Sequence, residues 1–182
     1  MTVIRGDLAL AVMASVMNLT GYIVVGHHHE QADVFTVISL HIVGMFGLVL
    51  VVGQLVDRAG RHRSLIGGLL VMAVSSVMLA WVVEIAGISL SLFLLGLGWN
   101  ISYVAASAEL VTHATPVERQ GLVGFTDLVA GLSAAALALM GGFAYSEWGV
   151  AAIAVGATIA VIGPAILISL RRPPAVAPEP AS

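Results

Sequence analysis

The chain has 182 residues, of which 59% are hydrophobic and 9% are charged, and its mean hydropathy is +1.06. Soluble globular proteins carry about a quarter charged residues, and a chain this short cannot hide so many apolar side chains in one core. Lipid is therefore the solvent for most of the chain, which excludes a soluble enzyme, a nucleic-acid-binding protein or a disordered tail as a description of the whole. The net charge of −3 gives no support for nucleic acid. The absence of cysteine excludes disulfides, thiolate metal sites and cysteine nucleophiles.

Six apolar stretches are each long enough to cross the ~30 Å hydrocarbon layer as a helix, which takes about 20 residues. Backbone groups in lipid must bond within their own segment, and the alternation typical of β-barrel strands is missing. The first stretch is interpreted as a span, because Asp7 precedes it and no small-residue cleavage site follows it. The sequence thus predicts an all-α polytopic membrane protein with six transmembrane helices within residues 1–172, followed by a disordered proline-rich tail, 173–182. The expected spans are 8–26, 34–56, 64–83, 88–111, 121–145 and 150–170.

The arginines predict the orientation of the chain. If the six spans are correct, all seven arginines fall in the termini and links on one side of the membrane, whereas the links on the other side carry only acidic charges. The positive-inside rule makes the arginine side cytoplasmic, so both termini are expected in the cytoplasm of a cell membrane. The arginines are Arg5, Arg58, Arg61, Arg63, Arg119, Arg171 and Arg172, and the acids of the opposite links are Glu30, Asp33, Glu84 and Glu147.

The link after the second expected span reads GQLVDRAGRHR, residues 53–63. Glycine permits a tight reversal, and arginines would hold the turn at an anionic cytoplasmic surface. The stretch resembles the G-x-L-x-D-R-x-G-R signature between the second and third helices of a major facilitator superfamily (MFS) half. The matching positions are Gly53, Asp57, Arg58, Gly60 and Arg61.

Further stretches resemble the same family: HIVGMF at 41–46, LGLGWNISYVAAS at 95–107, and ERQG at 118–121, which opens the fifth span. The likeness runs from about Arg5 to Arg172 and is nearest to the C-terminal half of bacterial drug-efflux-like or uncharacterised permeases. Family members have twelve spans in two halves, whereas six are expected here. The fifth span also lacks the proline-glycine antiporter signature, which argues against drug/proton antiport.

The resemblance implies a secondary transporter that moves a small organic solute by alternating access between two halves. A homodimer or a second MFS half would supply the missing wall. The alternative is a truncated, non-transporting fragment that needs a separate six-helix partner. An intramembrane enzyme is not expected, because the chain has no G-x-S-x-G elbow and no deep aspartate pair. No cofactor is expected, and the partners are a small-molecule substrate, the lipid bilayer and, as one alternative, protons.

Polar side chains on two faces are candidates for the substrate cavity, because the resemblance implies that the first and fourth helices line it. The alternative is that these groups bond neighbouring helices inside the bundle. His41 is a candidate for proton coupling or for a bond within the bundle, and Trp99 is interpreted as facing the cavity. The first face holds Ser15, Asn18 and Tyr22, and the second holds Asn100, Tyr103 and Ser107.

A cytoplasmic charge cluster is also predicted, joining Asp57 and Arg58 or Arg61 to Glu109, with Asp127 nearby. Similar clusters in facilitator halves act as latches that break when the cytoplasmic side opens. Alternatively, Asp127 lines the pathway and takes up a proton. The run His27–Glu30 is interpreted as a surface loop, because adjacent histidines splay apart and no second ligand cluster accompanies them; no metal site is expected.

Overall fold

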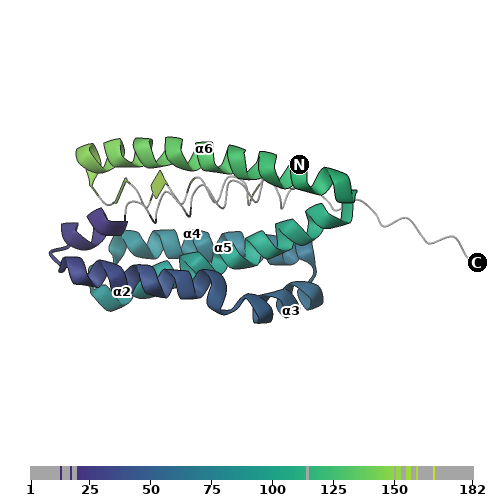
Figure 1. Ribbon diagram of the computed structural model, residues 1–182. Coiled ribbons are helices and arrows are strands. Elements are labelled where there is room, and N and C mark those ends of the chain that lie inside the picture. The colour runs from purple at the N-terminus through teal and green to yellow at the C-terminus, as the bar shows by residue number, and fades with distance from the viewer. Residues whose placement is uncertain are drawn as a thin grey trace, which may run out of the picture.

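The computed structural model describes Met13, Met17 and residues 20–113, 115–149, 151–152, 155–156, 159 and 166. Every regular element within these residues is a helix, and residues 20–26 form helical turns before the first bounded element. Figure 1 shows the arrangement. The elements are α2 (Gln31–Ile42), the π-helical turn η1 (Val43–Gly47), α3 (Val49–Ala59), α4 (Arg61–Trp81), α5 (Ile85–His113) and α6 (Pro116–Trp148).

Three of these helices are long and apolar enough to cross a membrane, through Arg61–Leu79, Ile85–Glu109 and Gln120–Trp148. The pair Gln31–Gly47 and Val49–Ala59, bent by 48°, passes the same test when taken together, which gives four spans if the pair crosses the membrane as one. The chain is therefore a multi-pass helical membrane protein. The first expected span before residue 20, most of the sixth and the proline-rich tail lie outside the described residues.

Close backbone contact at glycines builds the centre of the bundle, in which α5 packs against α4, α2 and η1. A Cβ added at Gly68 of α4 would lie 2.6 Å from the carbonyl oxygen of Gly98 on α5. On the opposite side of α5, a Cβ at Gly96 would lie 2.5 Å from the carbonyl oxygen of His41. A Cβ at Gly44 would collide with the carbonyl oxygen of Phe93. Small residues allow helices to approach this closely in lipid, where packing replaces the hydrophobic effect as the driving force.

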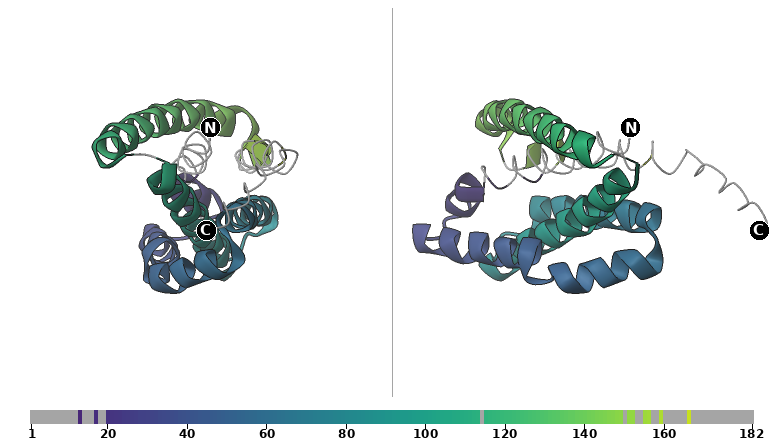
Figure 2. Two further views of the ribbon diagram at one scale, coloured as in Figure 1. Left: turned by 90° about the vertical axis from the view of Figure 1, so that its right-hand side faces the viewer. Right: turned by 45° about the vertical axis from the view of Figure 1, so that its right-hand side comes forward.

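The second expected span, 34–56, is a broken helix in the structure. Its helical turns widen to π geometry over Val43–Gly47 and break at Leu48, where φ is −109° and ψ is 12°. The break follows the point where Gly44 and Gly96 bring α2 and α5 together, and two glycines within five residues weaken the helix there. After the bend, α3 and α5 diverge (Figures 1 and 2).

The loop signature occupies the junction of α3 and α4. Gly53, Asp57 and Arg58 lie in α3, and Gly60 alone links Ala59 to Arg61 at the start of α4, with φ +88°. Asp57 and Arg58 are exposed. The motif therefore forms a helical hairpin with a one-residue turn.

The helix α6 is the least buried of the long helices. Within its apolar window 12% is buried, compared with 50% for α4 and 56% for α5. In Figures 1 and 2 it runs apart from the group formed by α2, α3, α4 and α5. Many of its apolar side chains are therefore exposed, among them Phe125, Leu132 and Phe143.

Candidate functional site

Three aromatic rings meet where the second span bends against α5. The rings of Trp99 and Tyr103 are stacked, with centroids 4.9 Å apart and planes inclined by 19°. The ring of Phe46, from η1, meets Trp99 edge-on at 6.0 Å and 74°. Trp99 is buried, whereas the side chain of Tyr103 is 40% exposed and that of Phe46 is 57% exposed. This aromatic cluster (Phe46, Trp99 and Tyr103) therefore has a buried centre and an open edge.

Two nitrogen donors beside these rings lack a partner. Asn100 and Trp99 are 2% and 6% exposed, and neither Asn100 Nδ2 nor Trp99 Nε1 has a hydrogen-bond partner in the described part of the chain. A buried donor without a partner costs about 1–3 kcal/mol. Both nitrogens are therefore unsatisfied donors enclosed by the helix packing.

His41 lies fully buried between α2 and α5. Its Nδ1 is 2.7 Å from the carbonyl oxygen of Leu92, so Nδ1 carries the hydrogen and donates it. Nε2 has no partner within the described residues. The Nδ1 bond therefore links two helices inside the bundle, and Nε2 is the ring nitrogen that has no partner there.

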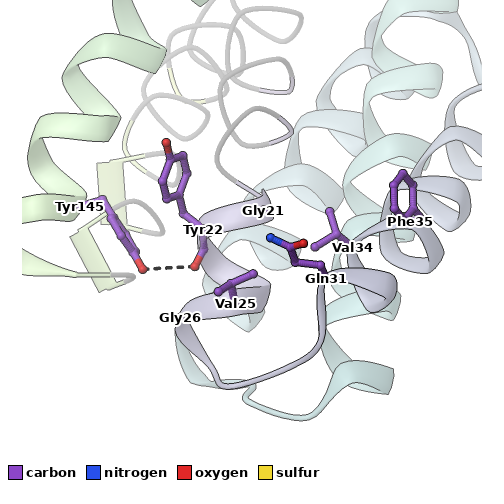
Figure 3. A pocket seen from close by; sticks show the side chains of 8 residues that line it. All are labelled: Gly21, Tyr22, Val25, Gly26, Gln31, Val34, Phe35 and Tyr145. Atoms are coloured by element: carbon purple, nitrogen blue, oxygen red, sulfur yellow. Dashed lines mark hydrogen bonds between the residues drawn. The ribbon is translucent and has the colours of Figure 1, made fainter.

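A hollow lies at the N-terminal end of α2, away from the aromatic cluster (Figure 3). It measures about 570 Å³, within the range of small-molecule pockets. Tyr145 of α6 closes one side, because its hydroxyl donates to the carbonyl oxygen of Tyr22 at 3.2 Å and the two ring centroids are 5.8 Å apart. A Cβ at Gly26 would lie 2.6 Å from that hydroxyl, so a larger residue there would displace the end of the Tyr145 side chain. The lining residues are Gly21, Tyr22, Val25, Gly26, Gln31, Val34, Phe35 and Tyr145.

The predicted cavity residues thus fall in different places. Tyr22 lines the hollow of Figure 3, whereas Trp99 and Tyr103 belong to the aromatic cluster. Asn100 follows Trp99 on α5 and is buried, and Ser107, one turn beyond Tyr103, is half-buried. Ser15 and Asn18 lie outside the described residues.

Of the predicted charge cluster, the structure brings together Arg61 and Glu109. Arg61 at the start of α4 is 4.0 Å from Glu109 near the end of α5, and both side chains are partly exposed. Ion pairs of this exposure contribute about 0–1 kcal/mol. Asp57, Arg58 and Asp127 are exposed and make no ion pair with one another or with Glu109 among the described residues.

The histidine run lies in the loop between residue 26 and α2, where His29 Nε2 is 2.6 Å from the carbonyl oxygen of Val83 in the α4–α5 link. This bond joins two loops at the same end of the bundle. No group of three or more histidine, aspartate or glutamate side chains in the described residues is placed to hold a metal ion.

The described helices, the one-residue turn at Gly60 and the polar face of α5 all agree with one family. The model of the Major Facilitator Superfamily matches residues 8–182. The chain belongs to the major facilitator superfamily.

Curated facilitators similar to this chain are bacterial. The riboflavin transporter RfnT of Brucella anthropi is 28% identical over 129 residues, which are 71% of this chain and 32% of that protein. Two uncharacterized MFS-type transporters of Bacillus subtilis also match. YddS is 30% identical over 91% of this chain and 39% of its own length. YdeG is 34% identical over 69% of this chain and 30% of its own length. This facilitator chain therefore spans about a third of the length of the curated relatives it matches.

Sequence reasoning missed Phe46 in the aromatic cluster and Gln31, Phe35 and Tyr145 in the hollow. The place of Phe46 depends on η1, because a π turn shifts the angular phase of every later residue away from the 3.6-residue period. Tyr145 and Tyr22 are 123 residues apart, and their bond depends on how α6 docks. The one signal of the hollow in the sequence was the small residue Gly26, and the residues around it do not set it apart from the other glycines of the chain.

Proposed function

We propose that this chain is one six-helix half of a secondary transporter and moves a small organic solute by alternating access. The observation that carries the proposal is membership of the major facilitator superfamily over residues 8–182, together with helices of membrane length. The named relatives are transporters, which favours transport over intramembrane catalysis. Facilitator halves are related by an axis along the membrane normal, and substrate binds between them.

The second wall of the cavity comes from a second copy of this chain or from another MFS half. If both termini lie in the cytoplasm, as the arginines predict, two copies insert the same way up and form a parallel dimer. The low burial of α6 supports a partner, because its apolar window carries Asp127 on an exposed side. A carboxylate facing lipid is costly, so a partner or a wet cavity is the more favourable neighbour for it.

In this arrangement the substrate faces the polar side of α5, and the pair Arg61–Glu109 belongs to a latch that breaks when the cytoplasmic side opens. The solute is an uncharged organic molecule, because Trp99, Asn100 and Tyr103 offer rings and an amide but no formal charge. Riboflavin, which the name of one relative gives as its substrate, is the first solute to test. The coupling ion is a proton if Asp127 or His41 takes part.

The experiment measures the mass of the purified chain in mild detergent by light scattering, with the detergent contribution subtracted, and then solute counterflow in proteoliposomes. A dimer that exchanges riboflavin or another small organic solute, with exchange lost in Asn100→Leu and retained in Trp81→Phe, supports the proposal. Trp81 is a suitable control because it is 83% exposed at the far end of α4.

The competing function is a truncated fragment that does not transport and needs a separate six-helix partner; the matched region covers about a third of the curated facilitators. It predicts a monomer without counterflow. Exchange that appears only when a separate six-helix half is co-expressed would favour this alternative over the homodimer.

A further inference from the structure

We propose that the hollow of Figure 3 binds a hydrophobic organic cation, such as an aromatic quaternary ammonium ion. The apolar body of the ligand fills the hollow against the exposed rings of Tyr22 and Phe35, and its positive charge is held by the carboxylates at the same end of the bundle. The site lies away from the aromatic cluster on α5. The inference goes beyond the proposed function and does not depend on transport.

The hollow has the size and the lining of a small-molecule site. Its volume is about 570 Å³, and such sites commonly measure about 300–1,000 Å³. Residues 20–26, the start of α2 and the end of α6 build it, and the bond from the Tyr145 hydroxyl to Tyr22 ties the first of these segments to the last (Figure 3). The amide of Gln31 and the two tyrosine hydroxyls are the polar side-chain groups of the lining, so the hollow suits a mostly apolar molecule.

Two aromatic rings of the lining are open to a ligand. The side chain of Tyr22 is 62% exposed and that of Phe35 is 76% exposed, although both residues line the hollow. A cation within about 6 Å of a ring centroid is attracted by the negative face of the ring. A neutral aliphatic chain gains contact area there but not this attraction.

The start of α2 places negative charge beside the lining. Glu30 directly precedes Gln31 and lies one helix turn before Val34, and both of these neighbours line the hollow. Glu30 and Asp33 form the capping box of α2, and their hydrogen bonds to backbone N–H groups leave both negative charges in place. The N-terminus of a helix carries about +0.5 charge, which two carboxylates outweigh.

The other charged side chains at this end are acidic as well. Glu147 lies two residues beyond Tyr145, and Glu84 lies in the α4–α5 link, which is bonded to the histidine loop before α2. No lysine or arginine occurs in residues 6–57, 64–118 or 120–170. Charge of one sign around a cleft raises the local concentration of the opposite ion. This end of the bundle therefore favours a cation and repels an anion.

Binding is measured by equilibrium dialysis of radiolabelled benzyltrimethylammonium against the full chain in phosphatidylcholine nanodiscs, with empty nanodiscs subtracted. A pH of about 8 keeps the nearby histidines neutral. Neopentylbenzene has the same shape without the charge, and benzenesulfonate is the anion; both are tested by displacement of the labelled cation. We expect saturable binding of the cation, at least about fivefold weaker binding of the neutral compound, and no displacement by the anion.

Tyr22→Leu and Phe35→Leu are each expected to raise the Kd for the cation about two- to fivefold, because each removes an exposed ring. Glu30→Gln is expected to act in the same direction, since the amide keeps an oxygen for the cap but loses the charge. Phe125→Leu, which removes a 65% exposed ring elsewhere on α6, and Asp57→Asn, at the far end of α3, are the matched controls. An unchanged Kd in all three hollow variants would overturn the inference.

A second measurement locates the ligand in the hollow. The chain has no cysteine, so Gln31→Cys places a single thiol in the lining and Ala32→Cys places one on the next residue, which is exposed but does not line the hollow. Benzyltrimethylammonium is expected to slow the maleimide reaction of the first variant at least severalfold and to leave the second unchanged.

Equal effects on the two thiols would remove the ligand from the hollow. Binding of neopentylbenzene as tight as that of the cation would show that the hollow takes apolar chains, such as those of lipids, and would also overturn the inference. Neither measurement involves solute exchange, so a negative result leaves the proposed function standing.

Discussion

Gly60 holds a backbone conformation that other residues rarely adopt. It is the only residue between α3 and α4, with φ +88° and ψ 142°. A Cβ at this position would meet no atom within 4 Å, so the demand for glycine comes from the backbone conformation and not from crowding.

Gly60→Ala is therefore expected to destabilise the chain by about 1–3 kcal/mol, the cost of a strained backbone region for a residue with a Cβ. Thermal unfolding in detergent would measure the change. Gly53→Ala is the control, because Gly53 lies inside helix α3 and also has nothing within 4 Å of an added Cβ. Equal melting temperatures for the two variants would contradict this account of the turn.

Asp127 is a carboxylate that lies seven residues into the apolar window of α6 and is exposed. If it carries the coupled proton, Asp127→Asn abolishes uptake driven by a pH gradient but leaves counterflow intact, because the amide cannot take up and release a proton. Glu147→Gln, in the last turn of α6, is the control. Normal gradient-driven uptake by the Asn variant would remove Asp127 from the coupling mechanism.

At the scale of whole elements, glycine pairs decide how closely the helices approach. Gly68 and its neighbour Gly67 share one helix turn of α4, yet only Gly68 faces α5, with an added Cβ 2.6 Å from the carbonyl oxygen of Gly98. Nothing lies within 4 Å of a Cβ at Gly67.

Gly68→Ala is expected to separate α4 from α5 and to cost about 1–3 kcal/mol, as overpacking does in well-packed cores. Gly67→Ala leaves the melting temperature unchanged or slightly raised, because alanine is the better helix former. Measuring both melting temperatures in the same detergent tests the interface. A loss of stability in both variants, or in neither, would mean that Gly68 does not set the spacing.

The start of α6 is fixed by a hydrogen-bonded cap. The hydroxyl of Thr115 donates to Glu118 Oε2 at 2.6 Å and its backbone N–H donates to the same atom at 3.1 Å. Both bonds hold the pKa of Glu118 below its ordinary value, and the bond from the Thr115 hydroxyl has the larger effect. A lowered carboxyl pKa means that the cap stabilises α6 at neutral pH and is lost as the pH falls through that lowered value.

Thr115→Ala is accordingly expected to raise the pKa of Glu118 back toward its ordinary value, whereas Thr115→Ser, which keeps the hydroxyl, holds it low. The titration is followed by NMR of a ¹³C-labelled Glu118 carboxyl in detergent. Identical titration curves for the alanine and serine variants would show that the hydroxyl does not stabilise the carboxylate.

For the whole molecule, the pattern of arginines makes a prediction that a cysteine-free chain can test directly. Glu84→Cys places a thiol in the α4–α5 link, and Ala59→Cys places one at the exposed end of α3. With the arginine side in the cytoplasm, a membrane-impermeant maleimide added to intact cells labels the first variant and reaches the second only after permeabilisation. The opposite pattern would invert the topology.

Composition and apolar runs were enough to predict an all-helical membrane protein, because length and hydropathy are properties of each segment alone. The motif around Gly60 and the similar stretches predicted the family. The bend after His41 was not predictable from the segment alone, since it lies where two helices pack closely, with Gly44 against the backbone of Phe93 and Gly96 against that of His41. For the same reason the sequence grouped Tyr22 with Tyr103, whereas the structure places Tyr22 beside Tyr145.

The exposed side of α6 also bears on the life of the chain in the cell. A carboxylate in the apolar region of a helix opposes membrane insertion by about 2.5–3.5 kcal/mol, and Asp127 occupies such a position on a helix with little packing. In the proposed two-half arrangement, a newly made copy that has not met its partner resembles the incompletely assembled subunits that membrane proteases remove. If a partner covers α6 as proposed, we expect the abundance of this chain to follow the supply of that partner, so that synthesis of the two walls is matched.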